Sequence, residues 1–193
     1  LQDGIHHGLI TGNQIVSNGQ NGIWITGGTH QNQIGFNTIT DNGSHGIQIE
    51  GAASLYNSIT RNSITRNRQS GIQLVGGNHS IEAPTVDVMM DQRQNLIGHI
   101  EAPDASLVEI FADANDEGET LIATASVLYN NFTASARIPT GKSIHATITH
   151  PDGNTSEFGP SIISSQTTPE SQTFVYADDA PGQSEIYIHY STS

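Results

Sequence analysis

The stretch Gly22-Ile-Trp-Ile-Thr-Gly27 recurs twice along the chain, as Gly46-Ile-Gln-Ile-Glu-Gly51 and as Gly71-Ile-Gln-Leu-Val-Gly76. The first glycines of successive copies are 24 and then 25 residues apart. A fixed period of this size is typical of a solenoid, in which each repeat forms one coil and buries its apolar side chains only by stacking on its neighbours. The three copies therefore predict at least three stacked coils.

A second pattern, of asparagine and isoleucine, fills the space between these copies. Asn37 and Ile39 of the middle repeat are matched by Asn62 and Ile64 in the next repeat. The apolar side chains alternate over about three residues, which is the pattern of a short strand rather than of a helix. Stacked in register, they predict four interior columns: Ile23/Ile47/Ile72, Ile25/Ile49/Leu74, Ile10/Ile34/Ile59 and Ile15/Ile39/Ile64.

Asparagines are expected to form two further stacks at the corners between strands, Asn13/Asn37/Asn62 and Asn18/Asn42/Asn67. Identical amides on parallel strands can hydrogen-bond to one another along the stacking axis. Asparagine and glycine also tolerate the left-handed backbone conformation that tight corners need. We therefore interpret these asparagines as structural.

The phrases Asn-x-Ile-x-x-Asn and Gly-Ile-x-Ile resemble the repeats of right-handed parallel β-helix proteins, the pectin-lyase-like superfamily. The resemblance covers residues 1–82. It implies the fold but not the chemistry, because the superfamily includes polysaccharide lyases, glycoside hydrolases, epimerases, phage tailspikes and surface proteins with no known catalysis. The chain begins within a coil, so we expect further coils before Leu1.

Residues 83–165 follow a different pattern, in which short alternating segments are separated by turn residues. Such a pattern predicts an antiparallel β-sandwich. Residues 108–111 and 152–158 resemble segments of the small immunoglobulin-like sandwich that is often appended to bacterial β-helix proteins. The expected strands are Thr85–Met90, Gln94–Glu101, Ser106–Asp113, Thr120–Leu128, Asn131–Arg137, Ser143–His150 and Ser156–Ile163.

Residues 166–193 are interpreted as a linker and a β-strand tail, with strands expected at Thr173–Tyr176 and Glu185–Tyr190. Two strands alone are marginally stable in water. The tail is therefore expected to dock on its own sandwich or to be donated to the sheet edge of a neighbouring chain. The complete prediction is an all-β chain that consists of parallel β-helix coils, an immunoglobulin-like sandwich and a short β tail.

The composition limits the possible partners. The net charge is −13, only 13% of the residues are charged, and Lys142 is the single lysine. No basic patch is available for phosphates, so neither nucleic acid nor an anionic membrane surface is an expected partner. No apolar run approaches the roughly 20 residues of a membrane span, so no membrane insertion is expected. The polar, lysine-poor composition favours a secreted protein at an extracellular or cell-surface location, and no cysteine is present to report the compartment.

One outward-facing column of the predicted solenoid carries Trp24, Gln48 and Gln73, with Glu50 beside it. The apolar face of a tryptophan ring can stack on a sugar ring, and side-chain amides can hydrogen-bond sugar hydroxyls. These four residues therefore predict a carbohydrate-binding face. The alternative is that the tail or a partner subunit covers Trp24.

No catalytic residue is assigned from the sequence. Glycoside hydrolysis needs two carboxyl groups about 5–9.5 Å apart, whereas Asp41 and Glu50 are expected at different places on their coil. A lyase-like base could come from a basic group formed by Arg61, Arg66, Arg68 and, one coil away, His45. Arg61 and Arg66 are expected at solvated corners instead. His6 and His30 are in register but lack a third ligand for a metal.

Residues 113–118 partly resemble a calcium-binding loop, because oxygen-bearing Asp113, Asn115 and Glu117 alternate and glycine is sixth. The twelfth position is Thr124 rather than glutamate, and no helices are expected beside the loop. The loop is therefore either a calcium site or an acidic hairpin loop. No other cofactor is expected.

The sequence favours a non-catalytic extracellular module with a structural or adhesive role, which self-assembles or binds a surface. Its expected partners are a polysaccharide or neighbouring subunits in a homo-oligomer or filament, with strand donation by the tail as one route. The alternative is the C-terminal part of a carbohydrate-active β-helix enzyme, such as a lyase, hydrolase or epimerase. A third interpretation is a calcium-dependent carbohydrate-binding module.

Overall fold

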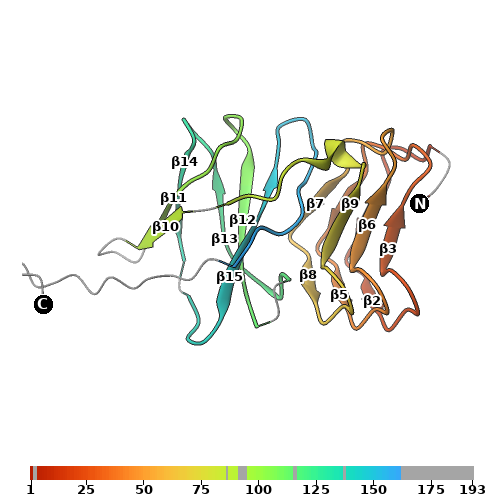
Figure 1. Cartoon of the computed structure of the whole chain (residues 1–193), viewed down its shortest axis with the longest axis horizontal. Coiled ribbons are helices and arrows are strands. Elements are labelled where there is room, and N and C mark those ends of the chain that lie inside the picture. The colour runs from red at the N-terminus through yellow and green to blue at the C-terminus, as the bar shows by residue number, and fades with distance from the viewer. Residues whose placement is uncertain (2–3, 86, 91–94, 115–116, 137, 162–193) are drawn as a thin grey trace, which may run out of the picture.

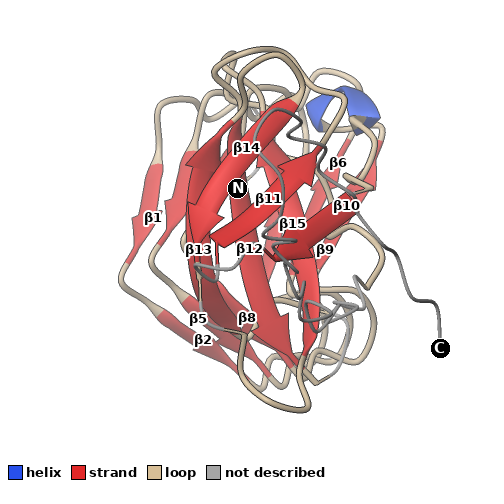
Figure 2. Cartoon of the chain, turned by 90° about the vertical axis from the view of Figure 1, so that its left-hand side faces the viewer, coloured by secondary structure: helices blue, strands red, loops and turns tan. Residues whose placement is uncertain are grey.

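The computed structural model describes residues 1, 4–85, 87–90, 95–114, 117–136 and 138–161 (Figure 1). Stacked parallel strands form one part of the molecule, which we call the β-helix. Antiparallel strands form the other part, residues 87–161, which we call the antiparallel unit. Figures 1 and 2 show that the antiparallel unit lies against one end of the β-helix. The predicted linker and tail lie outside the described residues.

Three coils of three short strands build the β-helix. The first coil holds β1 (Leu9–Thr11), β2 (Gln14–Val16) and β3 (Ile23–Ile25); the second holds β4 (Gln33–Gly35), β5 (Thr38–Thr40) and β6 (Ile47–Glu50); the third holds β7 (Ser58–Thr60), β8 (Ser63–Thr65) and β9 (Ile72–Val75). They stack into three parallel sheets, in the orders β1-β4-β7, β2-β5-β8 and β3-β6-β9. A short 3-10 helix, η1 (Asn78–Ser80), follows the third coil.

The four predicted interior columns are confirmed by the strand register. Ile23 pairs with Ile47, and Ile47 pairs with Ile72. The other three columns are in register in the same way. The columns form one apolar core, in which the side chains of the middle coil are fully buried. The apolar alternation of the sequence therefore sets which side chains fill the β-helix.

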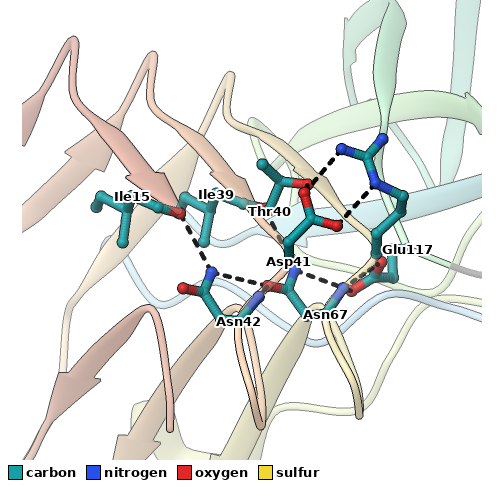
Figure 3. A network of polar contacts seen from close by, with 8 residues as sticks. Ile15, Ile39, Thr40, Asp41, Asn42, Asn67 and Glu117 are labelled. Carbon is teal, nitrogen blue, oxygen red and sulfur yellow. Dashed lines mark hydrogen bonds and ion pairs between the residues drawn. The ribbon is translucent and has the colours of Figure 1, made fainter. Parts of the chain in front are cut away.

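Three asparagine ladders run along the corners, one more than predicted. Asn13 donates to Oδ1 of Asn37 at 3.0 Å, and Asn37 donates to Oδ1 of Asn62 at 2.9 Å. Figure 3 shows the second predicted ladder, in which Asn42 donates to Oδ1 of Asn67 at 2.9 Å. The additional ladder joins three residues at another corner: Asn32, Asn57 and Asn78. Each buried amide is thereby hydrogen-bonded, as buried polar groups require.

The prediction that asparagine takes the left-handed conformation at the corners is wrong for every ladder asparagine except Asn78. At the other corners of the second and third coils, the residue before the asparagine takes it. Positive φ angles of 54–58° occur at Gln31, Phe36, Asp41, Tyr56, Arg61 and Arg66. The following asparagine then closes the corner through its side chain, as when Nδ2 of Asn37 donates to the carbonyl oxygen of Gly35 at 3.0 Å. Among the described asparagines, only Asn78 and Asn130 have positive φ. The ladder requires a side-chain amide in a fixed direction, which explains why asparagine follows the turn rather than making it.

Gly46 opens the repeated phrase because the neighbouring coil leaves no room for a side chain there. A Cβ atom at this position would lie 2.6 Å from the carbonyl oxygen of Gly71 and 2.7 Å from Cγ2 of Ile64. We predict that Gly46→Ala lowers the free energy of unfolding by about 1–3 kcal/mol, the usual cost of overpacking. Gly19→Ala is the control, since a Cβ atom at Gly19 would meet no atom within 4 Å apart from those of its chain neighbours. Denaturant unfolding of both variants tests this, and equal losses would contradict it.

The antiparallel unit consists of two three-stranded sheets that share one apolar core. One sheet has the order β10-β11-β14 and the other β13-β12-β15. The strands are β10 (Asp87–Met90), β11 (Asn95–His99), β12 (Leu107–Asp113), β13 (Thr120–Ser126), β14 (Asn131–Ser135) and β15 (Ser143–Thr149). Side chains from both sheets, including Leu96, Phe132, Val108 and Ile148, meet in the core. The first six predicted strands are therefore confirmed, with shifted ends.

The seventh predicted strand, Ser156–Ile163, is wrong over its described residues, 156–161, which form no strand. Thr155 makes an isolated bridge with Thr149, and beyond it the backbone runs irregularly beside β15. Two side chains of this segment, Glu157 and Phe158, contact the β-helix instead. Phe158 packs on the β-helix core and contacts the Phe111 ring edge-on, with centroids 5.3 Å apart. The residue pattern that predicted a strand over residues 156–161 is therefore part of the contact with the β-helix.

Candidate functional site

Trp24, Gln48 and Gln73 occupy one outward-facing column of the sheet β3-β6-β9, as predicted. Trp24 pairs with Gln48, and Gln48 pairs with Gln73. The strands alternate, so the isoleucines on either side of these residues point into the core. Trp24 is 41% exposed. This exposed ring is the starting point of the candidate site.

Glu50 connects two of these side chains. Its Oε2 atom accepts a hydrogen bond from Nε1 of Trp24 at 3.0 Å and another from Nε2 of Gln48 at 3.4 Å. The bond to Trp24 joins the first coil to the second and fixes the nitrogen edge of the indole ring. Glu50 therefore positions the ring, while much of the ring surface stays in contact with solvent.

A shallow, open depression adjoins the ring and is lined by Gln20, Asn21, Trp24, Ser44 and Gln48. Nδ2 of Asn21 donates to Oε1 of Gln48 at 2.7 Å, which orients the glutamine amide. The lining therefore consists of one aromatic ring, three amides and a hydroxyl, all uncharged. An aromatic ring beside neutral donors and acceptors suits a sugar, which has apolar ring faces and a rim of hydroxyls.

The structure joins Trp24, Gln48 and Glu50 by hydrogen bonds, whereas Gln73, although next to Gln48 in the sheet, bonds to another part of the chain. Nε2 of Gln73 donates to Oε1 of Glu157 at 2.7 Å. Glu157 belongs to the antiparallel unit, so Gln73 is part of the interface between the two parts of the molecule. Sequence reasoning missed Gln20, Asn21 and Ser44. Gln20 and Ser44 are one period apart, which indicates that they stack on each other. The direction of their side chains could not be predicted, because turn residues do not follow the apolar alternation of a strand.

The structure describes two of the three residues that were predicted to bind calcium. Asn115 lies outside the described residues. Asp113 is buried, and its Oδ2 accepts the backbone N–H of Glu117 at 2.8 Å. Glu117 is directed to the end of an asparagine ladder, where its carboxyl oxygens accept from Asn67 (Figure 3). Calcium binding stays a prediction, and both described carboxyl groups have other hydrogen-bond partners.

Glu109 and Glu117 are buried carboxyl groups whose pKa values are raised by burial. Hydrogen bonds from Asn67 oppose the shift at Glu117, and the charge of Asp113 adds to it. At Glu109 the backbone N–H of Arg61, at 3.0 and 3.1 Å from the two oxygens, and the Arg61 charge oppose the shift. The folded protein therefore retains these two protons to a higher pH than the unfolded chain does.

This shift gives a prediction for the pH dependence of stability. Folding raises the pKa of this kind of carboxyl group. Its contribution to the free energy of unfolding is therefore most favourable below the pKa in the unfolded chain, about 4.3 for glutamate. That contribution is lost as the pH rises through the pKa in the folded protein. Glu109→Gln keeps an acceptor for Arg61 but does not ionise. We expect the stability of the variant relative to the parent to increase between about pH 4 and pH 7. Denaturant unfolding across this range tests it, and a constant or decreasing difference would contradict it.

The basic residues considered for catalysis are placed separately. Arg66 forms a bidentate pair with Asp41, with both N–O distances 2.9 Å, and this hydrogen bonding lowers the pKa of Asp41. The guanidinium of Arg61 lies over the Phe36 ring, 5.4 Å from its centroid. Nδ1 of His45 lies 2.7 Å from Oγ of Ser70. Each side chain thus has its own local partner.

The in-register histidines are stacked. The rings of His6 and His30 are 5.2 Å apart at their centroids, and Nδ1 of His30 bonds the carbonyl oxygen of Gly28 at 2.8 Å. Over the described part of the chain, no group of three or more His, Cys, Asp or Glu residues could hold a metal ion. Within the same residues, no helix is long and apolar enough to cross a membrane.

Comparison with known proteins supports the fold of the N-terminal part. Residues 3–86 match the model of a protein family described as the right handed beta helix region. The matched segment contains all nine strands of the β-helix. A comparison with curated proteins found no match. The family match and the parallel strand stacks together fit a right-handed parallel β-helix.

Proposed function

We propose that the chain is a non-catalytic extracellular module that attaches to a polysaccharide through the face around Trp24. The observation that carries this proposal is the exposed Trp24 ring, held by Glu50 beside a depression lined with neutral polar groups. Sugar-binding sites combine an aromatic surface with a few oriented hydrogen-bonding groups. The stacked strands below the ring supply a rigid base.

The polar partners of the acidic residues favour binding over catalysis. Glu50 is hydrogen-bonded to Trp24 and Gln48, and Asp41 is paired with Arg66 on another corner. Acid–base catalysis of glycoside cleavage needs two carboxyl groups that flank one bond. The contacts of Glu50 and Asp41 instead give both residues structural roles.

We also propose that the antiparallel unit is an immunoglobulin-like sandwich that accompanies the binding module. Two antiparallel sheets on one apolar core agree with such a sandwich in architecture. Self-assembly by strand donation depends on residues 173–190, outside the described residues, and stays a prediction. A secreted, surface-attached role is part of this proposal.

Replacing Trp24 tests the proposed binding face. We expect Trp24→Ala to weaken binding to a responsive polysaccharide on a glycan array by at least about tenfold, since tenfold corresponds to only about 1.4 kcal/mol. Phe36→Ala is the matched control, because Phe36 is also an exposed aromatic residue of the β-helix, 61% exposed, but lies at the corner between β4 and β5 and not on the sheet face that carries Trp24. Binding that survives Trp24→Ala, or is lost equally in both variants, would refute the Trp24 face.

A further inference from the structure

The hydrogen bonds beside the Trp24 depression form one chain with a single direction. The backbone N–H of His45 donates to Oδ1 of Asn21 at 3.1 Å, and Nδ2 of Asn21 donates to Oε1 of Gln48 at 2.7 Å. Nε2 of Gln48 then donates to Oε2 of Glu50 at 3.4 Å. Neither amide can flip without losing both of these bonds, because donor would then face donor and acceptor would face acceptor. The backbone N–H at one end and the Glu50 carboxylate at the other therefore fix both amides.

The Glu50 carboxylate lies one hydrogen bond away from the depression. Its Oε2 atom also accepts from Nε1 of Trp24 at 3.0 Å, and a carboxylate suits two N–H donors because it is an acceptor only. Trp24 and Gln48 line the depression, whereas Glu50 is not among the lining residues. Its negative charge therefore acts on a bound ligand through space rather than by direct contact.

The groups that a ligand can use directly are neutral. Within the described part of the chain, the side chains of Gln20 and Ser44 make no hydrogen bond, so both are available to a ligand. The lining includes no arginine, lysine or histidine. Proteins bind carboxylate ligands chiefly with charged donors, and above all with arginine. A ligand carboxylate would lose its water here and gain only neutral donors, which costs free energy.

The charge on the protein opposes an anionic ligand as well. Two like charges about 4 Å apart repel strongly enough, even in water, to change an equilibrium constant about fivefold. The net charge of −13 adds a repulsive field around the whole chain. Salt weakens both effects, because the screening length falls from about 30 Å at 0.01 M to about 3 Å at 1 M ionic strength. The hydroxyl groups of an uncharged sugar meet no such repulsion.

We propose that the Trp24 face takes uncharged polysaccharides and that Glu50 is the specificity-determining residue, which excludes chains of uronic acids. This inference rests on the proposed function, since it names the class of polysaccharide for that face. Trp24, Gln20 and Ser44 supply attraction that neutral and acidic sugars share, so the carboxylate supplies the difference between them. Specificity of this kind comes from a repulsive element as much as from an attractive one.

Pairs of ligands that differ only in charge test the selectivity. The probes are oligosaccharides of glucose, mannose and galactose, each beside its counterpart in which the C6 hydroxymethyl groups are oxidised to carboxylates. Calorimetric titration of the intact chain at about 0.01 M salt should show at least about fivefold tighter binding of the neutral member. The ratio of the two affinities should shrink towards one at about 1 M salt. Equal or tighter binding of the oxidised member at low salt would overturn the proposal.

Glu50→Gln tests the residue itself. Glutamine keeps an oxygen that can accept from Trp24 and Gln48 but removes the charge. We expect the ratio of neutral to oxidised affinity to fall at least about threefold, and this ratio is independent of any general loss of affinity in the variant. Glu119→Gln is the matched control, because it removes the same charge from the antiparallel unit, where Glu119 pairs with Lys142 at 2.7 Å. Equal changes of the ratio in both variants would overturn the role of Glu50.

The outcomes separate this inference from the proposed function. Trp24→Ala should weaken both members of a pair, since both would use the ring. If no probe binds the intact chain, or if binding survives Trp24→Ala, the proposed function fails and this inference fails with it. If binding depends on Trp24 but shows no preference for the neutral member, the Trp24 face stands and the selectivity by Glu50 is wrong.

Discussion

Replacing Asn37 by alanine is expected to lower the free energy of unfolding by about 3–5 kcal/mol, because several buried polar groups lose their partner at once. Asn37 is buried in the middle coil. Its Nδ2 atom donates to the carbonyl oxygens of Ile10 and Gly35 and to Oδ1 of Asn62, at 2.9–3.0 Å. Its Oδ1 atom accepts from Asn13. Alanine satisfies none of these groups, and little water can reach them.

Asn13→Ala is the matched control for this substitution. Asn13 belongs to the same ladder but is exposed, and its side chain donates only to Thr11 and Asn37. Its loss should cost about 1 kcal/mol, since solvent can replace the missing bonds. The midpoint of guanidinium unfolding gives both values. Similar small losses for the two variants would show that the ladders contribute little to stability.

Glu117→Ala is expected to lower the free energy of unfolding by about 2–3 kcal/mol, because it leaves the backbone N–H of Asn67 without an acceptor and its Nδ2 with only the carbonyl oxygen of Ile39. Part of the loss is offset, since the buried carboxylate itself is costly, as its raised pKa indicates. The substitution also weakens the contact between the antiparallel unit and the β-helix. Amide hydrogen exchange at Asn67 should therefore accelerate together with the loss of stability.

Glu119→Ala controls for the removal of a nearby acidic side chain. Glu119 pairs with Lys142 at 2.7 Å, and both side chains are about one-third exposed, at 37% and 33%. Such a partly solvated pair contributes about 0–1 kcal/mol. If Glu117→Ala costs no more than Glu119→Ala, or leaves exchange at Asn67 unchanged, the carboxylate does not terminate the ladder.

The repeat predicted most of the β-helix, because its physical constraints are local and periodic. Alternation determined which isoleucines point inward, and the period determined which of them stack. The ladder through Asn78 was missed because Asn78 follows Asn57 by 21 residues, not by the 24 or 25 of the repeat. It reaches the ladder from the 3-10 helix η1, whose position depends on the end of the third coil.

The candidate site was predicted less completely, because some of its contacts also lie outside the period of the repeat. Trp24, Gln48 and Glu50 lie on strands, where alternation gives the direction of each side chain. Gln73 has the same pattern, but Glu157, 84 residues later, engages it. The contact of Glu117 with Asn67 spans 50 residues. No sequence period links the antiparallel unit to the β-helix, so an acidic loop that resembles a calcium site gives no sign that it ends an asparagine ladder.

The fluorescence of Trp24, the single tryptophan of the chain, tests the proposed function most directly. The intact chain would be titrated with neutral and uronic-acid oligosaccharides, and acrylamide quenching would be measured at each step. The proposed function predicts a saturable change in emission with at least one oligosaccharide, with Trp24 protected from acrylamide and the effect weakened by Gln48→Ala. An exposed Trp24 whose emission and quenching stay unchanged across the whole panel would contradict it.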